Sequence, residues 1–247
     1  LVSVAGIVPH SWQAAACVAG ALLVLAVVVL ADRRSRDRLF PSDAFTFGST
    51  VGAGLWVVLL MPVAQAATTV YLNITIQHLW GYGPTMAGYV SALMALSWSG
   101  SAVLVAGIVR PQAQRRLIRL GPALLALGLL GVMAALVTGQ PWLLMLCQVL
   151  IGTGFGISWA FLSQAVMEAA RPGERDSASA LLPTLQSGGY AIGAALSGLV
   201  ANEAGMAAAL APEAIIHAAT WVFGIAALLG TLGFLASFGV RPGGRSA

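Results

Sequence analysis

The spacing of the charged residues constrains the possible folds of this chain more than any other sequence feature. Between Ala44 and Val109 there is no Asp, Glu, Lys or Arg. One bilayer crossing needs only about 20 mostly apolar residues, so this stretch is long enough for more than one. A soluble domain carries about 25% charged residues, whereas this chain has 8% and is 59% hydrophobic. We therefore expect an all-α integral membrane protein.

Charged segments and turn-forming residues divide the chain into seven predicted transmembrane helices. Polar, turn-forming segments at residues 77–84 and 138–141 split the two longest uncharged stretches. The predicted helices cover residues 11–31, 44–74, 85–109, 117–137, 141–168, 177–201 and 213–239. We expect Ser42 and Asp43, and then Asp176 and Ser177, to cap helix starts. Pro212 followed by Glu213 is likewise typical of a helix start.

The arginines predict the orientation of these spans. All twelve basic residues are arginines, and they lie in four segments, 33–38, 110–119, 171–175 and 241–245. With seven spans, all four segments fall on one side, which the positive-inside rule makes cytoplasmic. The N-terminal end is then outside and the C-terminus cytoplasmic. Trp12, Trp80, Tyr82 and Trp142 would form the outer aromatic belt. Positive charge used in this way needs no nucleic-acid partner. Arginine without lysine, in an alanine-rich chain, favours a bacterial inner membrane.

Three passages resemble a known family. Residues 31–45 (ADRRSRDRLFPSDAF) resemble the charged linker before the C-terminal repeat of the fourteen-helix drug:proton antiporter branch of the major facilitator superfamily. Residues 79–88 (LWGYGPTMAG) are similar to the passage between the seventh and eighth core helices. Residues 151–156 (IGTGFG), 178–182 (ASALL) and 188–195 (GGYAIGAA) resemble the tenth and eleventh helices. One loop departs from the family, because residues 110–116 (RPQAQRR) lack its usual acid.

The resemblance implies a C-terminal half of a transporter. Residues 1–43 would comprise a linker helix and an arginine-rich loop, and residues 44–247 would form a six-helix repeat. The chain would belong to a secondary active transporter that exports small amphipathic or drug-like compounds by alternating access between two halves. Its expected partners are the small-molecule substrate, the lipid bilayer and an N-terminal half preceding Leu1. The resemblance implies neither a cofactor nor an enzymatic activity.

Polar and aromatic residues at helical spacing give the candidate substrate contacts. Polar groups within a span are costly unless they face the bundle or a cavity. One stripe joins Ser179, Pro183, Gln186, Tyr190, Gly193 and Ser197, and another joins Gln148, Gly152, Gly156, Trp159 and Ser163. We expect five residues to contact substrate. Trp159, Gln186 and Tyr190 come from these stripes, Gln65 from the predicted helix 44–74 and Trp98 from the predicted helix 85–109. The competing interpretation is helix packing, which the spacing of Gly189, Gly193 and Ser197 predicts by itself. Serines near Trp98 would then bond to their own backbone.

Several residue types are missing from the predicted spans. No Asp, Glu, Lys or Arg lies deep in any of them, and Glu168 falls at a helix end. If transport is proton-driven, the coupling carboxylate must therefore lie in the N-terminal half. There is no His and Cys cluster with zinc spacing, and Cys17 and Cys147 lie in apolar runs typical of buried thiols. Two alternatives stay open: a non-catalytic seven-helix partner or scaffold protein, and a receptor.

Overall fold

The computed structural model describes Val27, residues 40–205 and residues 211–243. This part of the chain is helical and has no strand, as the sequence predicts. Its helices are α3 (Thr50–Ala67), the π-helix η1 (Thr68–Leu72), α4 (Asn73–Trp80), α5 (Pro84–Val105), α6 (Pro111–Thr138), α7 (Pro141–Ala169), α8 (Arg175–Glu203) and α9 (Pro212–Ser237). Because α3, η1 and α4 follow one another without a break, they form a single rod of 31 residues.

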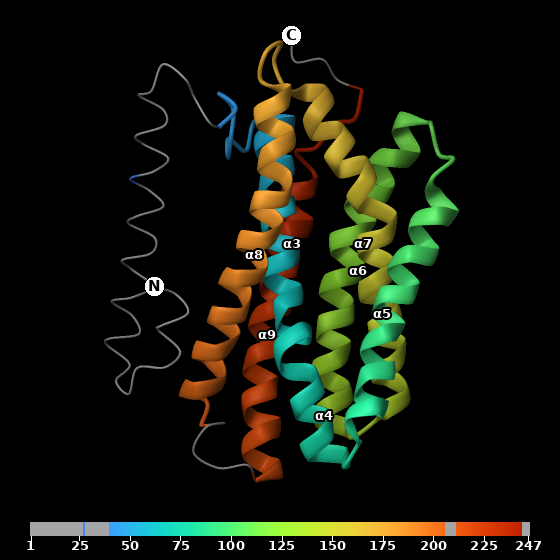
Figure 1. Ribbon diagram of the computed structural model, residues 1–247, viewed down its shortest axis with the longest axis vertical. Coiled ribbons are helices and arrows are strands. Elements are labelled where there is room, and N and C mark those ends of the chain that lie inside the picture. Colours follow the sequence, from blue (N-terminus) through green and yellow to red (C-terminus); the bar gives the residue numbers. More distant parts are fainter. Residues whose placement is uncertain (1–26, 28–39, 206–210, 244–247) are drawn as a thin grey trace.

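The helices stand side by side, with four at the centre and one on each flank (Figure 1). The centre consists of α3, α6, α7 and α9, whose main contacts are α6 with α7, α6 with α9, and α3 with α9. Of the two flanking helices, α5 packs mainly on α7 and α8 mainly on α3. Leu55, Met61, Phe155 and Phe223 are among the largest fully buried side chains. The flanking helices therefore have the most surface left for lipid or another protein.

Five of the described rods are long and apolar enough to cross a membrane. They are Thr50–Trp80, Pro84–Val105, Pro111–Thr138, Pro141–Ala169 and Pro212–Ser237. Helix α8 has 29 residues but is not among them, because polar side chains such as Thr184, Gln186 and Ser187 lower its hydropathy. The predicted helix at 11–31 lies outside the described residues, apart from Val27. The described residues thus confirm a multi-span helical protein, while seven spans stay a prediction.

The predicted capping residues at the first rod are wrong. Ser49 is the N-cap of α3, and its Oγ accepts a 2.9 Å hydrogen bond from the Gly52 N–H. Ser42 and Asp43 lie ahead of the helix and contact the loop between α7 and α8 instead. Ser42 donates through its N–H and its Oγ to the Glu174 carboxylate, each at 3.2 Å. Arg171 pairs with Asp43 at 3.1 Å. Ser42 and Asp43 therefore interact with residues distant in the sequence and do not cap the nearest helix.

Other helix boundaries differ from the predictions in informative ways. Helix α8 begins at Arg175, with Glu174 as its N-cap residue and no side-chain cap, so Asp176 and Ser177 already lie in the helix. Helix α6 begins at Pro111, six residues before the predicted start, because a proline suits the first turn. The predicted turn at 77–84 shrinks to Gly81–Gly83, where Gly81 has a φ of 63° and ends α4. The start of α9 at Pro212 agrees with the prediction.

The close helix approach predicted from small residues is confirmed between α3 and α8. A Cβ at Gly193 would collide with the carbonyl oxygen of Val63, and one at Gly189 would lie 2.8 Å from the Leu59 carbonyl oxygen. Ser197, one turn further along, is buried. These glycines therefore act in packing, since any larger residue would push the two backbones apart.

Candidate functional site

The candidate site begins at Gln65, near the end of α3. This side chain is 4% exposed, and its Nε2 donates to the Oγ1 of Thr69 at 3.1 Å and of Thr68 at 3.4 Å. The same Nε2 lies 3.2 Å from the Sδ of Met94 on α5. Its Oε1 is buried and has no hydrogen-bond partner. Burying an amide oxygen without a donor costs free energy. The Oε1 atom of Gln65 is therefore an acceptor that no described donor uses.

The π-helix η1 begins at Thr68, three residues after Gln65. Thr68, its first residue, donates from Oγ1 to the Gln65 carbonyl oxygen at 2.7 Å. A π-helical turn inserts an extra residue into the helix and is frequent at functional sites. Pro62 lies within the regular α-helix α3, and the change of helix type comes later, at Thr68–Leu72. The turn places the hydroxyls of Thr68 and Thr69 beside the Gln65 amide.

An aromatic row runs along the contact between α5 and α7. The rings of Trp98 and Phe155 have centroids 4.8 Å apart, and those of Phe155 and Trp159 are 6.2 Å apart. Phe155 is fully buried, whereas both tryptophans are partly exposed. Met94 lies one turn before Trp98 on α5 and connects this row to Gln65. The structure therefore brings Gln65, Trp98 and Trp159 into one continuous region.

Glycines on α7 let α5 come close enough to build this row. A Cβ at Gly152 would collide with the Met94 carbonyl oxygen, and one at Gly156 with the Trp98 carbonyl oxygen. Two serines near Trp98 bond to their own helix, as predicted: Ser97 donates to the Met94 carbonyl oxygen at 2.9 Å and Ser101 to the Ser97 carbonyl oxygen at 2.6 Å. These serines are therefore saturated, and the tryptophans remain as the functional candidates of this contact.

Gln186 and Tyr190 lie apart from the other candidates. Both are partly exposed and lie one turn apart on α8, the helix that flanks α3 on the side away from α5. No described hydrogen bond or ring contact joins either residue to Gln65, Trp98 or Trp159. The glycines between and after them, Gly189 and Gly193, press against α3. Within this chain the five candidates thus form a group of three and a separate pair.

Two polar groups were missed as candidates although the sequence carries a signal for them. Gln148 lies on the same α7 stripe as Gly152, and it is 2% exposed with a buried Oε1 that has no partner. Asn73 accepts a 2.7 Å hydrogen bond from Ser91, which ties α4 to α5. Gln148 could have been identified from the sequence, because it is a strongly polar residue within an apolar helix. The pairing of Asn73 with Ser91 depends on how α4 and α5 meet.

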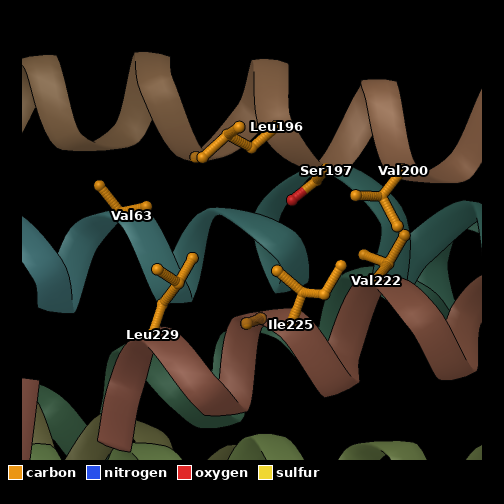
Figure 2. Close-up of a pocket in the computed structure, with 9 residues that line it drawn as sticks. Val63, Leu196, Ser197, Val200, Val222, Ile225 and Leu229 are labelled. Atoms are coloured by element: carbon orange, nitrogen blue, oxygen red, sulfur yellow. The ribbon is translucent and has the colours of Figure 1, made fainter. Parts of the chain in front are cut away.

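The pocket in Figure 2 is separate from this region. It lies between α3, α8 and α9 and is lined by apolar residues such as Val63, Leu196 and Leu229, with Ser197 as the polar exception. A lining of this kind offers one hydroxyl and no charge or amide. The pocket is therefore a packing gap of the helix bundle rather than a site that selects a polar ligand.

The acidic and histidine side chains of the described residues lie at or near the ends of the helices. Glu168, near the end of α7, accepts a 2.7 Å hydrogen bond from Gln164. His217 lies one turn into α9 and accepts from the Trp221 indole N–H at 3.2 Å. The described part of the chain holds no group of three or more His, Cys, Asp or Glu residues able to bind a metal.

Comparison with known proteins agrees with this architecture. Residues 1–194 match the family model of the Major Facilitator Superfamily. The chain is 31% identical over 210 residues to a probable multidrug-efflux transporter of Mycobacterium tuberculosis, covering 82% of this chain and 44% of that protein. It is 31% identical over 243 residues to a cephamycin export protein of Amycolatopsis lactamdurans, covering 92% and 49%. A puromycin resistance protein of Streptomyces alboniger is 27% identical over 203 residues, covering 81% and 40%.

These similarities set the class of the protein. The chain spans about half the length of the curated relatives that it matches. The relatives are named as efflux, export and resistance proteins of bacteria, and the apolar helical rods fit a multi-pass membrane protein. The extended family match and the apolar helical rods together show that the chain belongs to the major facilitator superfamily.

Proposed function

We propose that this chain is the C-terminal part of an exporter of small amphipathic, drug-like compounds. The observation that carries the proposal is the similarity to efflux and antibiotic-export proteins over 81% to 92% of the chain. Residues 44–247 would form one six-helix repeat, preceded by a linker helix and loop at 1–43. The arginine-rich loops would be cytoplasmic and the N-terminal end outside.

Transport would proceed by rocking of this repeat against an N-terminal half. Alternating access needs two halves around a site near the bilayer midplane. The exposed sides of α5 and α8 leave room for a second bundle, since each of these helices packs mainly on one neighbour. The described spans have no carboxylate near their middle, so a proton-coupling acid belongs to the N-terminal half in this proposal.

Gln65 would supply hydrogen bonding to the substrate. Its unpartnered Oε1 can accept a hydrogen bond from a substrate hydroxyl or ammonium group. Trp98 and Trp159 would offer flat apolar surfaces that bind varied rings and attract cations. Gln186 and Tyr190 would approach the substrate from α8. A site with few fixed polar groups and several aromatic surfaces suits substrates that share amphipathic character rather than one shape.

The test is drug export by cells that express the full-length protein from its native reading frame. We expect export of puromycin, or of other amphipathic drugs in a panel, above the vector control and its loss when a protonophore is added. Gln65→Leu should reduce export of donor-bearing drugs by about tenfold, because a lost hydrogen bond to a buried acceptor is worth about 1.4 kcal/mol.

Gln164→Leu is the matched control, since Gln164 is an exposed glutamine near the end of α7. Export by the control variant should equal that of the unchanged protein. Export at the vector level for every drug would contradict the proposed function. Full export by the Gln65→Leu variant would instead show that Gln65 does not contact the substrate, without contradicting the proposal that the protein is an exporter.

A further inference from the structure

The first two turns of α6 carry an unusual concentration of positive charge. Arg110 precedes the helix, and Arg115, Arg116 and Arg119 follow within it. The N-terminus of a helix is the positive end of its dipole, where acids are stabilising and arginines are not. Helix α6 has no acidic residue at all between Pro111 and Thr138. This end of the helix therefore combines four positive charges with an unfavourable dipole.

Two of these arginines are partly buried without partners. Arg115 and Arg119 lie one helical turn apart, and the Nε atom of each is buried with no hydrogen-bond partner. Among the described residues, neither side chain forms an ion pair, because the described salt bridge joins Arg171 to Asp43. A buried guanidinium N–H without an acceptor costs free energy, so an acceptor from outside the described chain would stabilise both side chains.

Phe238 completes the surroundings of Arg119. The guanidinium carbon of Arg119 lies 4.5 Å from the centroid of the Phe238 ring, which is within cation–π range. The chain after α9 also returns to the start of α6, since a Cβ at Gly243 would lie 3.8 Å from Pro111. Arg241 follows α9 in this same segment. Positive groups from two helix ends therefore meet at one corner of the bundle.

Acids on the neighbouring helices do not neutralise this corner. Glu168 lies at the same end of α7, but its Oε1 accepts a hydrogen bond from Gln164 rather than from an arginine. The acid of α9, Glu213, lies in the first turn of that helix, at the opposite end of the bundle. The positive charge of Arg115 and Arg119 is thus uncompensated within the described chain.

An exposed apolar surface begins next to the arginines. Helices α6 and α9 touch where Gly230 meets Ala126, since a Cβ at Gly230 would lie 3.2 Å from the Ala126 Cα. Beside this contact Leu120 and Leu127 of α6 are 49% and 59% exposed, and Leu235 of α9 is 58% exposed. In a membrane protein such a leucine surface faces acyl chains. A ligand with a negative head and apolar tails fits the corner better than a free ion.

We propose that Arg115 and Arg119, together with the Phe238 ring, bind the phosphodiester of an anionic phospholipid such as phosphatidylglycerol. The phosphate oxygens accept from the two guanidinium groups, which are suited to bidentate recognition of phosphate. The acyl chains lie along the exposed leucines of α6 and α9. Basic pockets between transmembrane helices commonly bind lipid head groups in this way. The site is distinct from the residues assigned to substrate.

Native mass spectrometry tests this proposal. The full chain is purified in detergent, mixed with defined lipids, and released from the detergent in the spectrometer. The protein is titrated with phosphatidylglycerol and, in parallel, with phosphatidylcholine, at about 0.3 M salt so that separated charges are screened. We expect a first phosphatidylglycerol to bind at least tenfold more tightly than phosphatidylcholine. Arg115→Gln with Arg119→Gln should remove that preference. Phe238→Leu should weaken it less, since only the cation–π contact is lost.

Arg171→Gln with Arg175→Gln is the matched control, because both arginines are exposed, lie at the loop between α7 and α8 rather than on α6 or after α9, and the variant loses the same charge. It should keep the preference for phosphatidylglycerol. Equal losses in the two double variants would overturn the proposal and indicate general attraction to a positive surface. Displacement of the bound lipid by millimolar glycerol phosphate would overturn it as well, in favour of a soluble anion. Far-UV circular dichroism of each variant separates loss of binding from loss of folding.

Discussion

At the scale of single residues, this protein is governed by small side chains at helix contacts and by a few unpartnered polar atoms. Gly189 and Gly193 bring α8 against the backbone of α3, while Gly152 and Gly156 bring α5 against α7. Gln65 and Gln148 each keep a buried amide oxygen without a donor. Both kinds of residue break the apolar pattern of a membrane helix, but the glycines stabilise packing whereas the glutamines leave acceptors free.

One prediction at this scale concerns Gly193. Gly193→Ala adds a single Cβ that would collide with the Val63 carbonyl oxygen, so the backbones of α3 and α8 must separate. Overpacking of this kind costs about 2 kcal/mol. We expect the apparent melting temperature in detergent to fall by about 5 °C, as followed by the elution of folded protein after heating.

Gly188→Ala on the same helix is its control. A Cβ at Gly188 has nothing within 4 Å, and alanine stabilises a helix relative to glycine by about 0.5–1 kcal/mol. The melting temperature of this control should therefore stay the same or rise. If the Gly193→Ala variant were as stable as the control, the backbones of α3 and α8 would have to lie further apart at Gly193 than in the structure.

At the scale of elements, the first rod is the least uniform. Regular α-helix continues past Pro62 to Ala67, a π-helical turn follows, and α4 then runs to Trp80. The turn is surrounded by side chains that hold it: Gln65 bonds to Thr68 and Thr69, and Asn73 bonds to Ser91 of α5. A turn with poorer backbone geometry, next to a candidate substrate group, is suited to bending.

Hydrogen exchange should detect this difference. We expect the amides of Thr69–Asn73 to exchange at least tenfold faster than those of Val57–Ala66, because local opening of a π-helical turn costs less free energy than opening regular helix. The measurement is exchange of the full chain in detergent, read by mass spectrometry of peptides. Residues 151–159 of α7, at a comparable position within a regular helix, provide the reference. Equal protection of all three segments would show that the turn is rigid.

The contact ahead of α3 is a second feature of element scale. Ser42 and Asp43 join the loop between α7 and α8 through Glu174 and Arg171. The side chain of Arg171 is 56% exposed, so solvent screens the ion pair and its contribution to stability is small. This contact orients the entry into the first rod more than it stabilises the fold.

At the scale of the whole molecule, the helices form a central group with α5 and α8 on opposite flanks. Helices α3, α6, α7 and α9 bury one another, while α5 and α8 each pack mainly on one of them (Figure 1). Helix α8 also has the lower hydropathy, as it carries Gln186 and Tyr190. A helix that contacts both a bundle and a second protein half needs less apolar surface than one surrounded by lipid.

Whether α8 crosses the membrane is a prediction at this scale. Its 29 residues are long enough to span about 30 Å of hydrocarbon. In a protein with Cys17 and Cys147 replaced by serine, we expect cysteines introduced at Gly173 and Gly205 to react with an impermeant maleimide from opposite sides of the membrane. A cysteine at Gly83, in the loop before α5, should react from the same side as one at Gly205. Labelling of positions 173 and 205 from one side would contradict a spanning α8.

The sequence by itself determined the class of fold and most of the element positions. Long apolar stretches interrupted by arginines can satisfy their backbone in a membrane only as helices, so α5, α7 and α9 lie within a few residues of their predicted ranges. The spacing of Gly189, Gly193 and Ser197 likewise predicted a close helix contact, because that pattern depends only on residue size along one helix face.

Only the tertiary structure decided which side chains meet. The pairing of Ser42 with Glu174 spans 132 positions in the chain, and no local pattern specifies it. The joining of Gln65 to Trp98 and Trp159 depends on Met94 and Phe155, whose positions follow from how α3, α5 and α7 pack. The π-helical turn is also set by its neighbours, since Thr68–Leu72 has no sequence feature that separates it from ordinary helix. Local periodicity records which face of a helix is small or polar, but the partner of that face is fixed by packing in three dimensions.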